Sequence, residues 1–154
     1  AFPSGVGSVP IEIAESAAPV IYHSKEFATD TGGAGRYRGG LGQRVEIGAR
    51  NRETLKLSAA AFERLKIGPA GRDGGLPGAP GRVEITDGTV IDDKGNYEIP
   101  PGERLILRTP GGGGFGDPGL RAADLIKRDI AEALVSEDQG SKLYKYNSQN
   151  RKEQ

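Results

Sequence analysis

The chain has 154 residues and no formal net charge at pH 7, because 21 Lys and Arg balance 21 Asp and Glu. This length fits a single domain with a modest core, and the lack of a basic block argues against nucleic acid or an anionic membrane as a partner. No apolar run approaches the roughly 18 residues of a membrane-spanning helix. The absence of Cys excludes disulfides, zinc–thiolate sites and cysteine nucleophiles, and a single histidine, His23, disfavours a multi-histidine metal site.

Glycine dominates the composition. The chain contains 25 Gly and 10 Pro, whereas glycine averages about 7% of residues in proteins. No strict Gly-x-y period is present, so the pattern is not collagen and instead predicts many tight turns between short strands. The first residue is Ala1 and no Met occurs, from which we expect a processed chain or a piece of a longer one.

The N-terminal region predicts two extended segments, residues 9–13 and 19–23. The first alternates apolar and polar residues, with Ile11 and Ile13 on one face. The second is apolar and β-branched and contains His23. Because that histidine lies within an apolar strand, we expect it to be packed and structural, without a role in proton transfer.

Further short strands are predicted along the middle of the chain, with a charged hairpin turn at 50–53 and a long loop at 62–81. The predicted strands cover residues 43–49, 54–60, 82–86, 90–91, 96–99 and 103–109. The later connections are too short for crossover helices, which favours antiparallel pairing. We therefore predict a mainly β fold, an antiparallel barrel or sandwich with Gly-rich loops and one or two C-terminal helices.

Helical periodicity begins only after residue 119. Apolar residues recur on one face, with Asp129 among the polar residues largely opposite; the apolar set is Ala122, Ile126, Ile130, Ala133 and Leu134. Ser136 and Gln139 form a capping-box pattern that predicts a second short helix ending near residue 143 or 144. We expect a β-rich body at 1–119, a helical appendage of the same domain at 120–145 and a frayed tail at 146–154.

The glycine run at 111–116 matches G-x-G-x-x-G, but a dinucleotide site is rejected here. Asp117 and Pro118 stand between the glycines and the next helix, and no strand follows to complete a βαβ unit. The alternative is that these glycines allow sharp turns with positive φ and close backbone packing. Asp117 followed by Pro118 then predicts an N-cap with proline at the first helical position. No P-loop or G-x-S-x-G elbow is present.

The loop at 30–42 carries Arg36, Tyr37 and Arg38 among six glycines. In one interpretation the two arginines clamp a carboxylate or phosphate, with backbone N–H groups forming an anion nest. In the other they pair internally with Asp30 or Glu46, and Tyr37 stacks on a neighbour. The residues alone favour the internal role.

An ordered set of motifs resembles the C-terminal part of the hydantoinase B/oxoprolinase family, over residues 1 to about 144. The motifs are AFPSGV at 1–6, VPIE at 9–12 with Glu15, TGGAGRYRGGLG at 31–42, GLPGAPG at 75–81 and TPGGGGFGDP at 109–118. Residues 139–141 depart from the family pattern, because Gly140 interrupts the usual helix. No catalytic residue is carried over from the resemblance.

The resemblance implies a cytoplasmic, ATP-dependent enzyme that opens a cyclic amide such as 5-oxoproline or a hydantoin. It implies two partners, a hydantoinase A-type actin-like ATPase subunit and the upstream part of the same subunit, which would carry the catalytic residues. ATP and a divalent metal are implied for the whole complex and no cofactor for this segment, so the isolated segment is expected to be inactive. A related ketone carboxylase subunit and a non-catalytic assembly module remain as alternatives. Within such a complex, the loop at 30–42 is expected to bind a group outside this segment. The positions expected to line a substrate site or an interface are Asp30, Arg36, Arg38, Gly111, Gly112, Gly113, Gly114 and Asp117.

Overall fold

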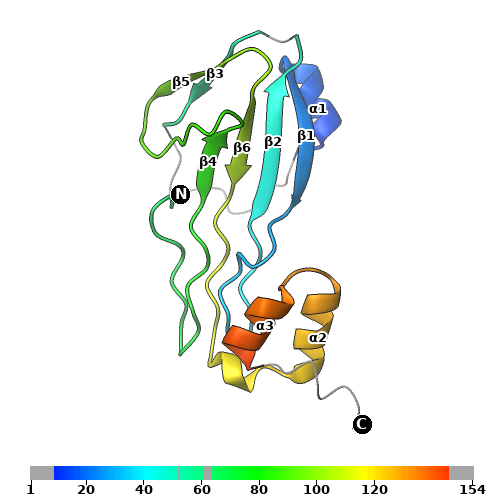
Figure 1. Ribbon diagram of the computed structural model, residues 1–154, viewed down its shortest axis with the longest axis vertical. Helices are drawn as coiled ribbons and strands as arrows, with labels where there is room; N and C mark the ends of the chain where they lie inside the picture. The colour runs from blue at the N-terminus through cyan, green and yellow to red at the C-terminus, as the bar shows by residue number, and fades with distance from the viewer. Residues whose placement is uncertain (1–8, 52, 61–63, 146–154) are drawn as a thin grey trace.

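The computed structural model describes residues 9–51, 53–60 and 64–145. Strands gather at one end of the elongated molecule, and five extended glycine-rich segments run from the strands toward the other end. Two short helices, α2 (Ala123–Ala131) and α3 (Glu137–Tyr144), lie beside those segments (Figure 1). None of the described helices is long and apolar enough to cross a membrane.

The main sheet has four strands in the order β1 (Val20–Phe27), β2 (Gln43–Ala49), β6 (Arg104–Arg108) and β4 (Arg82–Ile85). All its pairings are antiparallel, as predicted. A second antiparallel sheet joins β3 (Leu55–Ser58) to β5 (Asn96–Ile99). The two sheets form a partial sandwich, and the described strands close no barrel.

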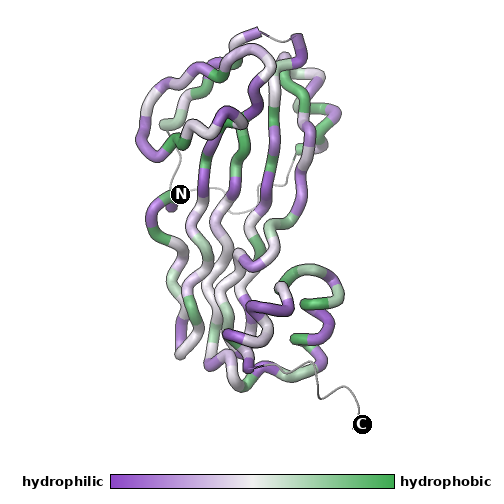
Figure 2. Tube along the Cα trace, viewed as in Figure 1, coloured by the Kyte–Doolittle hydropathy of each residue, from purple (hydrophilic) through white to green (hydrophobic). Residues whose placement is uncertain are grey.

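Alternation along the strands gives the main sheet one apolar and one charged face. Val45 pairs with Leu107 and Ile47 with Leu105 on the apolar face. The small sheet covers the β4–β6 half of that face, and the buried residues between them are Ala59, Val83, Ile85, Ile91, Ile99 and Leu105. Figure 2 shows apolar and polar residues alternating along these strands. The opposite face carries ion pairs, such as Arg44 and Arg104 with Glu46.

The predicted strand at residues 9–13 is wrong, because helix α1 spans Ile11–Ala17. The carbonyl oxygen of Pro10 accepts bonds from the N–H groups of Ile13 and Ala14. Two apolar residues at period two are too short a signal to separate strand from helix, and proline is compatible with a helix start. The carboxylate of Glu15 accepts a 2.7 Å bond from the N–H of Tyr22, which holds the helix against β1.

Three other details of the strand region also differ from prediction. Strands β2 and β3 lie in different sheets, so residues 50–53 are not a hairpin turn; residue 52 lies outside the described residues. Val90 forms only an isolated bridge with Glu84 instead of a strand. His23 is exposed at an irregularity in the β1–β2 register, not packed. Strand pairing is a tertiary property, which explains these errors.

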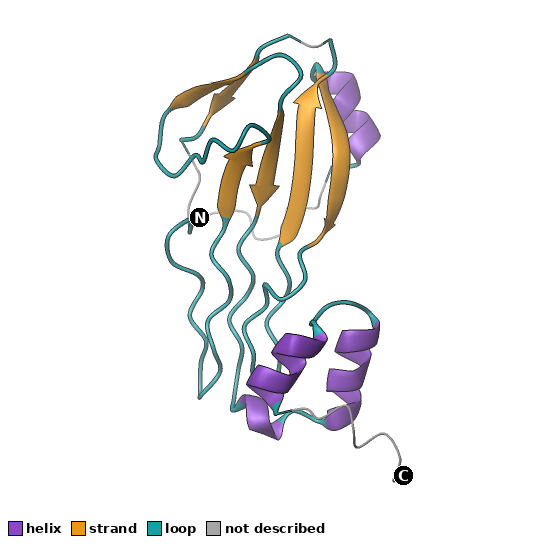
Figure 3. Cartoon of the chain, viewed as in Figure 1, coloured by secondary structure: helices purple, strands orange, loops and turns teal. Residues whose placement is uncertain are grey.

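The C-terminal region contains a 3₁₀ turn at Pro118–Leu120 and helices α2 (Ala123–Ala131) and α3 (Glu137–Tyr144) (Figure 3). The predicted caps are confirmed, because Asp117 accepts from the N–H of Gly119 and Ser136 from that of Gln139. Helix α2 stops before Ala133, which has a φ of 55°. Residues 139–141 do not interrupt α3, and a Cβ on Gly140 would lie 2.9 Å from Ile130 Cδ1, so glycine lets α3 approach α2 closely.

Candidate functional site

The glycine-rich motifs come together as one structure, which we call the glycine bundle. It consists of the extended segments 31–35, 39–42, 68–72, 75–79 and 111–115, which run side by side in Figures 1 and 3. Hydrogen bonds join them in place of a regular ladder. Gly33 N donates to Gly112 O at 2.8 Å, Gly112 N to Gly40 O at 2.8 Å, and Gly114 N to Leu76 O at 2.9 Å. Residues 111–115 thus connect segments that are far apart in the sequence.

At most glycines of the bundle a side chain is excluded because neighbouring backbones approach too closely. A Cβ on Gly111 would overlap the carbonyl oxygen of Thr31, one on Gly113 that of Ala70, and one on Gly114 that of Ala34. Collagen places glycine at its crowded axis for the same reason. The predicted close packing is therefore confirmed, but the predicted positive φ occurs within this run only at Gly116, where φ is 75°.

One end of the bundle carries an exposed aromatic pair. Tyr37 and Phe115 exchange two backbone hydrogen bonds of 3.0 and 2.9 Å, and their ring centroids are 6.2 Å apart. Arg72 extends this contact on the other side, since its N–H donates to Gly114 O and its carbonyl accepts from Gly116 N. The guanidinium carbon of Arg36 lies 5.6 Å from the centroid of the Tyr37 ring, within the range of a cation–π contact.

Arg38 has an internal carboxylate partner that the sequence did not indicate. The Oδ2 atom of Asp129 accepts from Arg38 Nε at 3.2 Å and from Arg121 Nη2 at 2.6 Å, and Asp129 is only 1% exposed. The two expected partners bind elsewhere: Asp30 accepts from Ser136 N, and Glu46 pairs with Arg44 and Arg104. The helical periodicity predicts Asp129 on the polar face, although its position three residues after Ile126 puts it beside the apolar stripe.

The remaining predicted site residues separate into two places. Gly111 to Gly114 lie within the bundle, and Asp117 follows it at the same end as Arg36. Asp30 instead contacts the loop between α2 and α3, because its carboxylate accepts from Ser136 N at 2.8 Å and its N–H donates to Leu134 O at 3.2 Å. Asp30 has a φ of 64°, a conformation that Asp tolerates better than most residues.

Tyr144 packs over the Arg38–Asp129–Arg121 cluster. Its ring centroid lies 5.9 Å from the guanidinium carbon of Arg121, and the residue is 6% exposed. Burial raises the pKa of Tyr144 above its ordinary value of 10.0, and the positive charges of Arg121 and Arg38 oppose that rise. The phenol therefore stays protonated at neutral pH.

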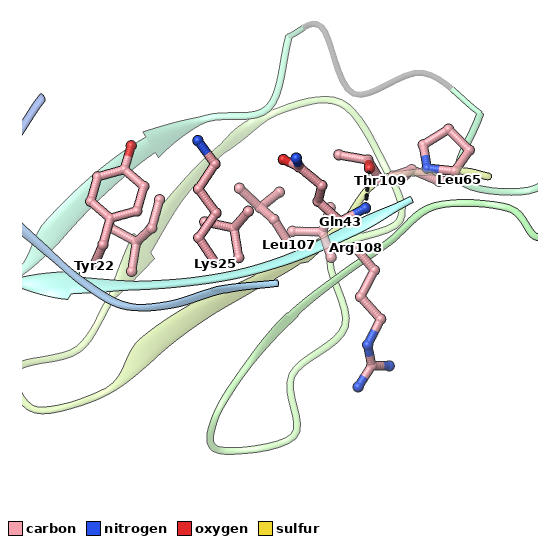
Figure 4. A pocket seen from close by; sticks show the side chains of 11 residues that line it. Tyr22, Lys25, Gln43, Leu65, Leu107, Arg108 and Thr109 are labelled. Atoms are coloured by element: carbon pink, nitrogen blue, oxygen red, sulfur yellow. Dashed lines mark hydrogen bonds between the residues drawn. The ribbon is translucent and has the colours of Figure 1, made fainter. Parts of the chain in front are cut away.

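A second concave region, which sequence reasoning missed, lies on the apolar face of the main sheet (Figure 4). This groove has a volume of about 440 Å³. It occupies the part of the face that the small sheet leaves open, and its lining includes Tyr22, Lys25, Val45, Ile47 and Leu107. Thr109 at its end accepts a 2.8 Å bond from Gln43 N. These residues come together only through the pairing of β1 with β2 and of β2 with β6, so no local motif indicates the groove.

The described residues offer no group of three or more His, Cys, Asp or Glu side chains that could hold a metal ion. Two carboxylates near the bundle have structural tasks, since Asp117 caps the 3₁₀ turn and Asp129 forms a double ion pair. Within residues 9–51, 53–60 and 64–145 we therefore place no site for the divalent metal that the resemblance implies for the whole complex.

Comparison with known proteins identifies the family. The family model for hydantoinase B/oxoprolinase matches residues 1–118, so the chain belongs to this family. The matched residues include the whole glycine bundle and both arginines of the loop at 30–42.

Two named relatives are a caprolactamase subunit and a 5-oxoprolinase. The caprolactamase subunit beta of Pseudomonas jessenii is 33% identical over 144 residues, which cover 86% of this chain and 24% of that protein. The crystal structure of ATP-dependent caprolactamase from this organism superposes with a TM-score of 0.77 and 29% identity, over 92% of this chain and 26% of that one. The 5-oxoprolinase of Saccharomyces cerevisiae is 36% identical over 110 residues, 68% of this chain and 8% of that protein.

A nucleotide-free structure of acetone carboxylase has the same fold, with a TM-score of 0.70 at 21% identity over 88% of this chain and 22% of that one. The chain spans about a quarter of the length of the caprolactamase subunit and of both solved chains, and less than a tenth of the yeast protein. The whole enzymes therefore contain much that this segment lacks.

Proposed function

We propose that the chain is the C-terminal domain of the B-type subunit of an ATP-dependent enzyme that opens a cyclic amide. The observation that carries this proposal is the 33% identity to a caprolactamase beta subunit over 86% of this chain, together with the family match. The relationship to 5-oxoprolinase supports the same class of substrate, because 5-oxoproline and caprolactam are both lactams.

The proposed enzyme contains a hydantoinase A-type ATPase subunit as a partner. A lactam carbonyl is a poor electrophile, and coupling ring opening to ATP makes the hydrolysis favourable. We assign the ATP chemistry to the partner, and the catalytic residues with any divalent metal to the upstream part of the B-type subunit. We propose a cytoplasmic location for the complex, because the proposed reaction consumes ATP.

Within such an enzyme, this segment acts as a rigid platform. The glycine bundle joins distant parts of the chain through backbone bonds, and the Asp129 cluster fixes the helical pair to it. Asp30, Arg36 and Asp117 are proposed to line an interface, whereas the geometry of Arg38 and Gly111 to Gly114 fits an internal role. We treat 1–119 and 120–145 as parts of one domain.

The test combines the full-length subunit, its ATPase partner and ATP with 5-oxoproline, a hydantoin or caprolactam. We expect ATP-dependent formation of the ring-opened amino acid from one of them, measured by mass spectrometry. Acetone with bicarbonate serves as the competing substrate pair. Carboxylation without lactam opening would show a carboxylase, and complex formation without either reaction would show an assembly module.

A further inference from the structure

The exposed end of the glycine bundle combines two aromatic and two cationic side chains, which we call the aromatic tip: Arg36, Tyr37, Arg72 and Phe115. Tyr37 is 58% exposed and Phe115 48% exposed, although their backbones are hydrogen-bonded to one another. Both arginines are exposed as well. Aromatic residues and arginine are the types most enriched at the energetic centres of protein interfaces.

The aromatic tip is held rigidly, which favours recognition. Tyr37 and Phe115 are fixed by a double hydrogen-bonded bridge, and Arg72 bonds to the residues on both sides of Phe115. The backbone of Gly35 packs directly against that of Phe115, since a Cβ on Gly35 would lie 2.6 Å from Phe115 N. A surface whose backbone is already ordered loses little conformational entropy on binding.

The positive charges of the aromatic tip have no carboxylate partner in the part of the chain that the structure describes, unlike those of several other arginines. Arg38, Arg44 and Arg104 each have a carboxylate partner, whereas Arg36 and Arg72 have no ion pair with a described residue. Asp73 and Asp117 lie beside the tip in sequence, so its charge is mixed, and Asp117 is engaged in capping Gly119. A mixed surface with a central aromatic pair fits a protein partner better than a polyanion.

We propose that the aromatic tip is a docking surface for a second protein subunit, whose contacting surface presents an apolar side chain beside a carboxylate. The inference rests on the proposed function, which supplies the ATPase subunit as that partner. Related chains are about four times as long, so the rest of the B-type subunit is the competing occupant of this surface. A separate subunit is favoured because the tip is small, half-exposed and rich in polar groups, as non-obligate interfaces are.

The test measures binding of the full-length B-type subunit to the immobilised ATPase subunit by biolayer interferometry. The double variant Tyr37→Ala/Phe115→Ala is expected to weaken binding by about tenfold or more. Arg36→Glu/Arg72→Glu, which changes only exposed side chains, is expected to weaken it similarly. Phe27→Ala is the matched control, because Phe27 is an aromatic residue that is 66% exposed at the end of β1. Its affinity should stay within about twofold of wild type.

Melting temperatures of all variants are measured in parallel. If the aromatic variant is unfolded, the affinity of the arginine variant provides the test instead. Wild-type affinity in a folded aromatic or arginine variant overturns the inference. So does photo-cross-linking from position 37 that reaches only the subunit's own chain. Failure of the proposed function has a different signature: a wild-type complex that forms through this surface but opens no lactam with ATP.

Discussion

Asp129 on α2 binds Arg38 of the glycine-rich loop across 91 positions of sequence, with 3.2 Å between Oδ2 and Nε. The same oxygen lies 2.6 Å from Nη2 of Arg121, whose side chain is 6% exposed. One buried carboxylate therefore neutralises part of two guanidinium charges and ties the helical pair to the glycine bundle.

Removing that carboxylate should destabilise the protein strongly. In Asp129→Ala, two largely buried guanidinium groups lose their anionic partner, and the expected loss is about 3–5 kcal/mol of unfolding free energy. Urea denaturation followed by circular dichroism measures it. Asp124→Asn, on the exposed side of the same helix, is the control and should cost less than about 1 kcal/mol. Equal effects of the two variants would mean that the cluster contributes nothing specific.

The two arginines of the 30–42 loop should differ in their effect on stability. Arg38→Ala breaks a charge-assisted bond to a buried carboxylate and should cost about 1.5–3 kcal/mol. Arg36→Ala removes only an exposed cation–π contact and should change stability by no more than about 1 kcal/mol. Thermal denaturation of both variants checks the difference. A large loss in Arg36→Ala would reveal an internal role for Arg36 and count against its place in an interface.

Neighbouring glycines provide a test of the bundle's packing. A Cβ on Gly39 would overlap the carbonyl oxygen of Gly112, whereas one on Gly40 would meet no atom within 4 Å. Gly39→Ala should therefore cost about 3 kcal/mol, the upper end for overpacking, because the clash is with backbone. Gly40→Ala should be nearly neutral or stabilise by up to about 1 kcal/mol. Similar denaturant midpoints for the two variants would contradict the packing described here.

Stability should fall at alkaline pH because of Tyr144. Its folded-state pKa is raised above the ordinary value of 10.0, so the folded protein retains this proton longer than the unfolded chain does. The resulting stabilisation is complete below pH 10 and is lost as pH rises from 10 through the folded-state pKa. Tyr144→Phe should flatten this part of the stability profile, measured by urea denaturation between pH 8 and about 11. If Tyr144→Phe leaves the dependence of stability on pH unchanged, the alkaline loss of stability belongs to other groups.

The isolated 154-residue chain is expected to be catalytically inactive. No P-loop is present in the sequence, and the described residues contain no metal-binding cluster. Incubation with ATP, Mg²⁺ or Mn²⁺ and 5-oxoproline should yield neither phosphate nor glutamate above a buffer blank. Metal-dependent turnover by the purified chain would place the catalytic residues inside this segment and refute their assignment upstream.

The sequence by itself determined the features that depend on neighbouring residues. Period-two alternation located β2 and β6, and the side chains of Asp117 and Ser136 predicted helix starts that the structure confirms. Ordered motifs also indicated the family. These signals succeed because strand alternation and capping are satisfied within a few residues.

Tertiary structure decided which distant residues meet. Nothing local shows that Gly111 packs on Thr31, that Asp129 is buried with Arg38, or that β3 leaves its neighbour β2 for a separate sheet. The short pattern around Ile11 and Ile13 fits a strand and a helix equally well. The helix that forms is held to β1 by the bond between Glu15 and Tyr22, which are seven residues apart. Burial and pairing depend on the whole chain, because a group's desolvation and its partners are set by segments that are remote in sequence.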